Sequence, residues 1–345
     1  AFSPFRLPAF PAVPIVGALC CSALALFQAV AVPSAGVLAA LWLAMGAIFY
    51  LTQLAPRAQV VDASAEALDP QLLKLRGRCP LVLVPIANPA SAPTLMKMAD
   101  ALAPHSVARV LLLSVVRPAG EDDRDELPQR LQDAQSVLGG ALSTALDVDL
   151  RPEALITVSD DPWGEIARVS ERDRCESVLV GVGTLGEGLM TGPLEDLMGR
   201  VDGDVVILRA PPAWQVDRAR RILVPSGGRR DQSPVRARLI GNLCRTAERV
   251  ITYLRVLPAA TDAAAERLAH RDLQRMARDE APGASTAETM RSDAMVDEAV
   301  NRAADCDLLI LGLQRLGRRQ KVFGNTVLEI ARKTSCPLLM ISRRS

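Results

Sequence analysis

The residues of this chain that are best suited to chemistry form a glycine-bearing segment near its end. Gly312, Gly317 and Gly324 mark the segment, and Asn325 and Thr326 follow the last of them. Glycine lets the backbone approach a phosphate closely, and the N–H groups at a helix start offer donors and a positive dipole end. The segment therefore predicts a cradle for a phosphate or another anion.

Basic side chains crowd the same segment. They are Arg315, Arg318, Arg319 and Lys321. Guanidinium groups pair with phosphates through charge-assisted hydrogen bonds. A solvated basic surface, or one that faces an anionic membrane leaflet, is the alternative interpretation.

A second candidate contact follows the apolar run at residues 222–225. Pro225 ends that run, and Ser226, Gly227 and Gly228 could supply a hydroxyl group and backbone contacts to a ligand. The alternative is a plain strand-to-helix turn, capped by Ser233, with proline at the first helical position.

Patterns that would indicate catalysis or metal binding are missing from the sequence. It holds no GxSxG, HExxH or GxxxxGK[ST] motif, and no CxxC or Cys/His spacing, so we expect neither an enzyme nor a metal site. Balanced charge and 3% aromatic residues argue against nucleic-acid binding. The mixed charges of residues 265–280 are interpreted as a solvated helix face.

Elements that would position the glycine segment are predicted from residue 79 onward, where short β-rich apolar runs alternate with helical patterns. Three runs recur after a domain-sized interval: LVLVP (81–85) as ILVP (222–225), CESVLVG (175–181) as CDLLILG (306–312), and DVVIL (204–208) as PLLMI (337–341). The recurrence predicts two copies of one doubly wound α/β unit, with any ligand at the carboxyl ends of the strands.

The first part of the chain has a different composition, because residues 7–56 carry no charged side chain. Residues 14–32 and 37–55 are apolar runs of 19 residues, each long enough as a helix to cross a bilayer. Residues 33–36 (PSAG) predict a tight turn between two antiparallel spans. Arginines and a lysine flank the pair and place its ends in the cytoplasm; a signal peptide or a buried soluble hairpin are the alternatives.

Two family resemblances follow from these residues. Residues 1–55, above all the opening AFSPFRLPAFPAVPIVG, resemble the last two spans of bacterial amino acid, polyamine and organocation (APC) permeases, which implies a membrane protein whose transport core lies upstream. Residues 79–343 look like tandem universal stress protein (UspA-like) domains, many of which bind adenine nucleotides and dimerise through their last strands. Tandem copies imply a homodimer or an intramolecular pseudo-dimer.

The glycine loops depart from the universal stress pattern. That pattern is glycine, two residues, glycine, nine residues, then glycine with Ser or Thr, whereas the interval from Gly312 to Gly324 is one residue shorter and Gln314 or Arg315 replaces the second glycine. In the first copy the glycine loop is four residues shorter than the family loop after Gly186, and Pro193 replaces the Ser or Thr. We therefore expect any nucleotide at the second copy.

The sequence thus predicts an N-terminal transmembrane hairpin (1–56), a linker (57–78) and two doubly wound parallel-sheet domains of universal-stress-protein, adenine nucleotide α-hydrolase-like type (79–212 and 219–345). The expected function is a cytoplasmic regulatory tail of an amino-acid-type permease in the bacterial inner membrane, which binds ATP, AMP or a cyclic dinucleotide. The alternative is a dimerising scaffold without nucleotide. The candidate nucleotide-binding residues are Pro225, Ser226, Gly227, Gly228, Gly312, Gly317, Arg318, Arg319, Gly324, Asn325 and Thr326.

Overall fold

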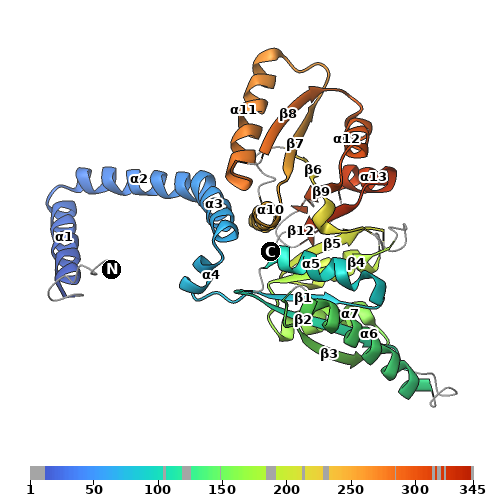
Figure 1. Ribbon diagram of the computed structural model, residues 1–345. Coiled ribbons are helices and arrows are strands. Elements are labelled where there is room, and N and C mark those ends of the chain that lie inside the picture. Colours follow the sequence, from blue (N-terminus) through green and yellow to red (C-terminus); the bar gives the residue numbers. More distant parts are fainter. Residues whose placement is uncertain are drawn as a thin grey trace, which may run out of the picture. The chain divides into compact units, whose positions relative to one another are not determined.

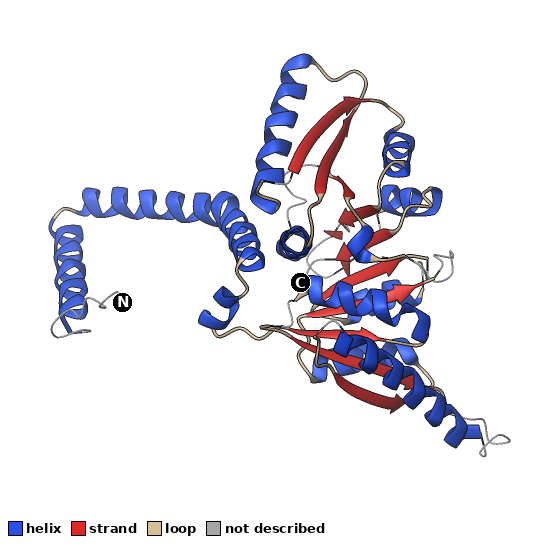
Figure 2. Cartoon of the chain, in the orientation of Figure 1, coloured by secondary structure: helices blue, strands red, loops and turns tan. Residues whose placement is uncertain are grey.

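The computed structural model of the protein describes residues 12–103, 106–118, 126–147, 149–183, 192–211, 214–227, 233–283, 285–312, 315–316, 320–321 and 324–342. Contacts divide the chain into two compact units, Ala1–Ala58 and Gln59–Ser345. The described part of the first unit is helical, and the second unit is an α/β structure (Figures 1 and 2).

Helices α1 (Ala12–Ala31) and α2 (Pro33–Phe49) make up most of the first unit, followed by a π-helical turn, η1 (Tyr50–Leu54). Large apolar side chains such as Trp42 and Leu43 are exposed along α2. Among the described residues one segment, Pro33–Leu54, is long and apolar enough to cross a membrane, while the apolar stretch in α1 is shorter (Ile15–Ala25). The structure thus offers one candidate span where the sequence predicts two.

The predicted turn at residues 33–36 is wrong in its position. Val32 alone separates α1 from α2, and Pro33 to Gly36 form the first turn of α2. Proline is well tolerated at the first helical position because its missing N–H would have no partner there. The antiparallel arrangement of two spans stays a prediction.

Ten strands of the second unit form one sheet, in the order β3-β2-β1-β4-β5-β12-β9-β6-β7-β8. The first half of the sheet holds β1 (Leu81–Pro85), β2 (Arg109–Val116), β3 (Glu153–Val158), β4 (Ser177–Val182) and β5 (Asp204–Arg209). The second half holds β6 (Arg221–Pro225), β7 (Val250–Leu257), β8 (Ser285–Arg291), β9 (Leu308–Gly312) and β12 (Leu338–Ser342). Each half is parallel and has the same order of strands from its edge to the middle of the sheet.

The two halves join where β5 and β12 pair antiparallel, with Leu338 opposite Arg209 and Ser342 opposite Val205. This pairing makes the sheet continuous through one chain, so residues 59–345 form a single compact unit. Because the strands run in opposite directions across the join, the carboxyl ends of the second half lie at the same edge as the amino ends of the first half.

Helices cover both faces of the sheet (Figure 2). One face packs against α5 (Ala92–Leu102), α6 (Leu127–Asp147), α10 (Pro234–Thr246) and α11 (Ala263–Glu280). The other packs against α7 (Pro162–Arg172), α9 (Pro193–Arg200), α12 (Met295–Ala304) and α13 (Asn325–Lys333). Neighbouring residues of one strand, such as Leu83 and Val84, are both fully buried, as continuous apolar strands predict.

The segment expected to be a linker, residues 57–78, is mostly helical. It contains the larger part of α3 (Ala55–Leu68) and all of α4 (Gln71–Leu75). Val60, Ala63 and Ala67 are buried, and Val60 and Ala63 form a small apolar cluster with Ala237 of α10. Small apolar residues at helical spacing give α3 one face that packs against α10, so this segment is an ordered part of the α/β unit.

Candidate functional site

The predicted phosphate cradle lies at the carboxyl ends of β6 and β9, which are neighbours in the sheet. Pro225 ends β6, and the Ser226 N–H donates to the Leu254 carbonyl oxygen at 2.8 Å, while Gly312 ends β9. We call Pro225, Ser226, Gly227 and Gly312 the β6–β9 edge. Strand pairing therefore brings together two groups of candidate residues that are far apart in the sequence.

Gly324, Asn325 and Thr326 stand at the start of α13. Gly324 is the N-cap, in an extended conformation and without a side-chain capping bond, and Asn325 and Thr326 are exposed. No acidic residue lies in the first turn of α13, so its positive dipole end meets no neighbouring carboxylate of its own helix. Since α13 leads from the carboxyl end of β9 back to the start of the parallel strand β12, its first residues belong to the same edge of the sheet.

Several candidate residues fall outside the described part of the chain. They are Gly228, Gly317, Arg318 and Arg319. Between β9 and α13 the structure describes two short strands, β10 (Arg315–Leu316) and β11 (Gln320–Lys321), which pair antiparallel. The complete candidate set therefore stays a prediction, and its described members are those of the β6–β9 edge and the start of α13.

A buried ionic cluster lies directly beside the β6–β9 edge. The Arg236 guanidinium donates to both carboxylate oxygens of Glu280, with Nε–Oε2 and Nη2–Oε1 distances of 2.7 Å. Tyr253 donates its hydroxyl to Glu280 Oε2 at 3.0 Å. A Cβ added to Gly312 would lie 3.4 Å from Arg236 Nη1, which places the guanidinium against the end of β9. Burial, and then the charge of Glu280, raises the pKa of Tyr253 well above its usual value.

The first half has an apolar counterpart at this position. Its opening strand ends with the matching bond, from the Ile86 N–H to the Leu113 carbonyl oxygen, and its helix α5 also has a proline in its first turn. A Cβ added to Gly181, at the end of β4, would lie 3.0 Å from the Leu95 side chain. Leu95 thus takes the place that Arg236 has in the second half, and only the second half places a buried charge pair there.

The first-half glycine loop ends at a helix that is poorly suited to an anion. Gly192 is the N-cap of α9, Pro193 removes a backbone donor, and Glu195 and Asp196 lie in the first turn. Carboxylates in the first turn of a helix would repel a phosphate and already interact with the positive dipole end. Residues 184–191 of this loop are outside the described part.

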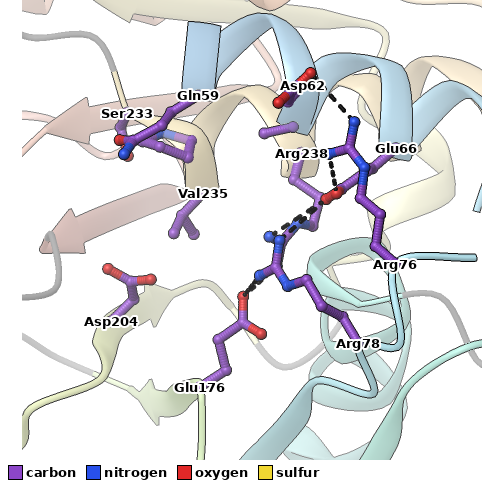
Figure 3. Close-up of a pocket in the computed structure, with 12 residues that line it drawn as sticks. Gln59, Asp62, Glu66, Arg76, Arg78, Glu176, Asp204, Ser233, Val235 and Arg238 are labelled. Atoms are coloured by element: carbon purple, nitrogen blue, oxygen red, sulfur yellow. Dashed lines mark hydrogen bonds and ion pairs between the residues drawn. The ribbon is translucent and has the colours of Figure 1, made fainter. Parts of the chain in front are cut away.

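A second site is a charged cavity of about 470 Å³ (Figure 3). Its walls come from α3, from the chain after α4, from the starts of β4 and β5, and from the first turns of α10. The lining residues are Gln59, Asp62, Ala63, Glu66, Arg76, Arg78, Glu176, Asp204, Ser233, Pro234, Val235 and Arg238. Ser233 caps α10 by accepting from the Arg236 N–H, so the cavity and the Arg236 cluster share one turn of helix.

Ion pairs connect the walls of the cavity. Arg238 Nη1 lies 2.7 Å from Glu176 Oε1, and Arg78 Nη2 lies 3.0 Å from the same oxygen. Glu66, whose side chain is 1% exposed, has Arg76, Arg78 and Arg238 nitrogens at 2.7, 3.4 and 3.9 Å. Burial by itself raises the pKa of Glu176, but Arg238 and Arg78 more than offset it, so the pKa lies below its usual value.

Sequence reasoning missed both of these charge clusters. Glu280 belongs to the stretch interpreted as a solvated helix face, yet its side chain is 0% exposed, so that interpretation is wrong at this residue. The sequence indicates the burial of Glu280 only weakly, because Glu280 ends α11 after the apolar stripe of Leu273, Met276 and Ala277. Only the fold brings Arg236 to it. The described residues contain no group of three His, Cys, Asp or Glu side chains that could hold a metal ion.

Comparisons with known proteins agree with this fold. Residues 220–342 match the model of the universal stress protein family. A universal stress protein from Archaeoglobus fulgidus has a similar structure, with a TM-score of 0.55 and 14% identity over 77% of this chain and 98% of that one. The protein PA1789 from Pseudomonas aeruginosa has a TM-score of 0.52 and 15% identity over 77% of this chain and 93% of that one.

One further similar structure is the cytoplasmic domain of a prokaryotic cation chloride cotransporter. It has a TM-score of 0.51 and 11% identity over 77% of this chain and 96% of that chain. No curated protein sequence matches the chain. The chain therefore carries a universal stress protein family domain at residues 220–342, within an α/β unit that has the fold of universal stress protein structures.

Proposed function

We propose that the α/β unit is the cytoplasmic regulatory part of a bacterial membrane transporter. The observation that carries this proposal is the run of helix from the candidate span into the α/β unit. The segments α2, η1 and α3 follow one another without a break from Pro33 to Leu68, and the last turns of α3 are buried against α10. The similar fold of a cotransporter's cytoplasmic domain supports the same role.

The transporter is proposed to be of the amino acid, polyamine and organocation type, in the inner membrane, with its transport core upstream of residue 1. The likeness of residues 1–55 to the last two spans of such permeases supports this class. The positive residues on the α/β side of the candidate span support a cytoplasmic location. With one candidate span in the described residues, the substrate path would belong to the upstream core.

The ligand is proposed to be an adenine nucleotide or a cyclic dinucleotide, held by the second half. The start of α13 would bind a phosphate through its exposed backbone N–H groups, and the β6–β9 edge would contact the rest of the nucleotide. Pro193 and the acids of α9 make the first half a poorer site. A non-catalytic role agrees with the lack of catalytic motifs, and a ligand would regulate transport by binding one state of the carrier more tightly.

The alternative function is a scaffold that binds no nucleotide. The Arg236–Glu280 pair favours this alternative, because each buried charge already has its counter-ion in the protein and needs no ligand to compensate it. The antiparallel β5–β12 pairing would then serve only to unite the two halves in one chain.

The test is calorimetric titration of the purified full chain in detergent with ATP, AMP and cyclic di-AMP. Gly324→Asp would place a carboxylate at the start of α13, and Gly192→Asp is the matched change at the start of α9. Saturable binding that is lost in Gly324→Asp and kept in Gly192→Asp is the expected result. If no ligand binds at millimolar concentration, the nucleotide proposal fails and the scaffold takes its place.

A further inference from the structure

Helix α10 lies beside the proposed nucleotide site and also packs against α3. Arg236 holds Glu280 beside the β6–β9 edge, and two residues later Arg238 holds Glu176 and approaches Glu66. Both arginines are nearly completely buried, 1% and 5% exposed. A displacement of α10 at Arg236 therefore also displaces Arg238, because both side chains belong to the same two turns of one helix.

Glu66 is the main polar anchor of α3. Its carboxylate is buried among guanidinium groups from Arg76, Arg78 and Arg238. A carboxylate is costly to bury unless nearby positive charges and hydrogen bonds compensate it. The docked position of α3 is therefore linked to the position of Arg238 on α10.

The apolar contact between the same helices is equally close. A Cβ added to Gly241 of α10 would lie 2.7 Å from the Cβ of Ala67, so α3 fits α10 only because that position has no side chain. Tightly packed contacts of this kind do not deform gradually; they are kept or lost.

The first half lacks this arrangement. At the positions of α5 that match Arg236, Arg238 and Gly241 of α10 stand Leu95, Lys97 and Asp100, counted from the proline in the first turn of each helix. Lys97 pairs with Asp217 of the short helix η4 (Val216–Arg218). The two buried arginines of α10, each paired with a carboxylate, are thus specific to the half that carries the proposed nucleotide site.

We propose that Glu66 and Arg238 form a latch through which a ligand at the second half releases α3. This inference rests on the proposed function, since it takes the second half as the nucleotide site. The part of the nucleotide that contacts the β6–β9 edge beside Gly312 brings oxygen atoms that compete with Glu280 for the Arg236 guanidinium, and this displaces the first turns of α10. The displacement separates Arg238 from Glu66 and loosens the helix that follows the candidate membrane span.

The latch makes a reciprocal prediction, because coupling between two equilibria acts equally in both directions. If a nucleotide favours release of α3, then a change that weakens docking tightens nucleotide binding. Glu66→Gln removes the charge with little change of shape. Asp62→Asn is the matched control on the same helix, because Asp62 is exposed and contacts only the exposed guanidinium of Arg76 among the interactions described.

The experiment uses the full chain in lipid nanodiscs and measures hydrogen exchange of the backbone amides of residues 59–68 with and without ATP, AMP and cyclic di-AMP. Affinities are measured on the same samples. We expect the bound nucleotide to speed exchange in α3 at least fivefold. Glu66→Gln should speed hydrogen exchange in α3 even without ligand, and its affinity for the nucleotide should be at least threefold higher. In Asp62→Asn both the exchange rate and the affinity should match the wild type within twofold.

The outcomes separate the latch from the proposed function. Nucleotide binding with unchanged or slower exchange in α3, and with equal or weaker affinity in Glu66→Gln, overturns the latch and leaves the nucleotide site standing. Failure of all three nucleotides to bind overturns the proposed nucleotide site, and with it any control of α3 by these ligands. Faster exchange in α3 together with tighter binding by Glu66→Gln supports both.

Discussion

The carboxylate of Glu280 lies 2.7 Å from two nitrogens of Arg236, and neither side chain is more than 1% exposed. The two residues are 44 positions apart, on α10 and α11. Such a pair costs free energy to desolvate and recovers it only while both partners are present. The pair therefore makes the second half sensitive to any change at either residue.

Glu280→Gln should strongly destabilise the α/β unit, because it leaves the Arg236 guanidinium buried without a counter-ion. We expect a loss of about 3 kcal/mol in unfolding free energy, measured by urea denaturation followed by circular dichroism. The double variant Arg236→Leu/Glu280→Met should recover most of the lost unfolding free energy, since Leu95 fills the matching place in the first half. A double variant no more stable than Glu280→Gln would contradict this account of the pair.

Gly241→Ala should loosen α3, because the added Cβ would lie 2.7 Å from that of Ala67. Overpacking of this kind costs about 1–3 kcal/mol, although alanine is the better helix former. Limited proteolysis within residues 59–68 should become faster, and adding Ala67→Gly should restore the wild-type rate. The control is Gly139→Ala in α6, where a Cβ meets nothing within 4 Å; equal effects at both glycines would refute the close contact.

Arg209→Met should fray the end of α13. The guanidinium of Arg209, on β5, donates to the carbonyl oxygens of Ala331, Thr334 and Cys336 at 2.5, 2.8 and 2.8 Å. Loss of these hydrogen bonds should lower the unfolding free energy by about 2 kcal/mol and speed amide exchange in the last turn of α13. Arg200→Met, which removes an exposed arginine, should leave that exchange unchanged.

Acid should weaken the α/β unit through Glu176, whose pKa is held below its usual value by Arg238 and Arg78 against the opposing effect of burial. A lowered pKa in the folded state gives stability that is complete above the unfolded pKa of about 4.3 and is lost as the pH falls through the folded value. The stability difference between wild type and Glu176→Gln should therefore be constant from pH 7 to pH 5.5 and shrink below about pH 4. A difference that stays constant down to pH 3 would rule out this linkage. Urea denaturation from pH 7 to pH 3 measures the stability difference. The control is Glu153→Gln, which changes an exposed glutamate.

Local patterns in the sequence predicted the elements well. The recurring runs near residues 81, 175, 204, 222, 306 and 337 are confirmed as strands, because short, continuously apolar segments are stable only when both faces are covered. Ser233 is confirmed as a helix cap, since capping depends on residues within one turn. The resemblance to universal stress proteins is supported at residues 220–342 by the family match.

Long-range charge pairing was decided by the tertiary structure alone. Arg78 meets Glu176 across 98 residues and Arg238 meets Glu176 across 62, and no local pattern indicates that charged side chains will be buried together. For the same reason the sequence predicts a linker at residues 57–78 and a solvated side chain at Glu280, where the structure has helices and a buried carboxylate. A sequence shows which residues are charged and which are apolar along one helix, but desolvation and pairing depend on what the fold packs against them.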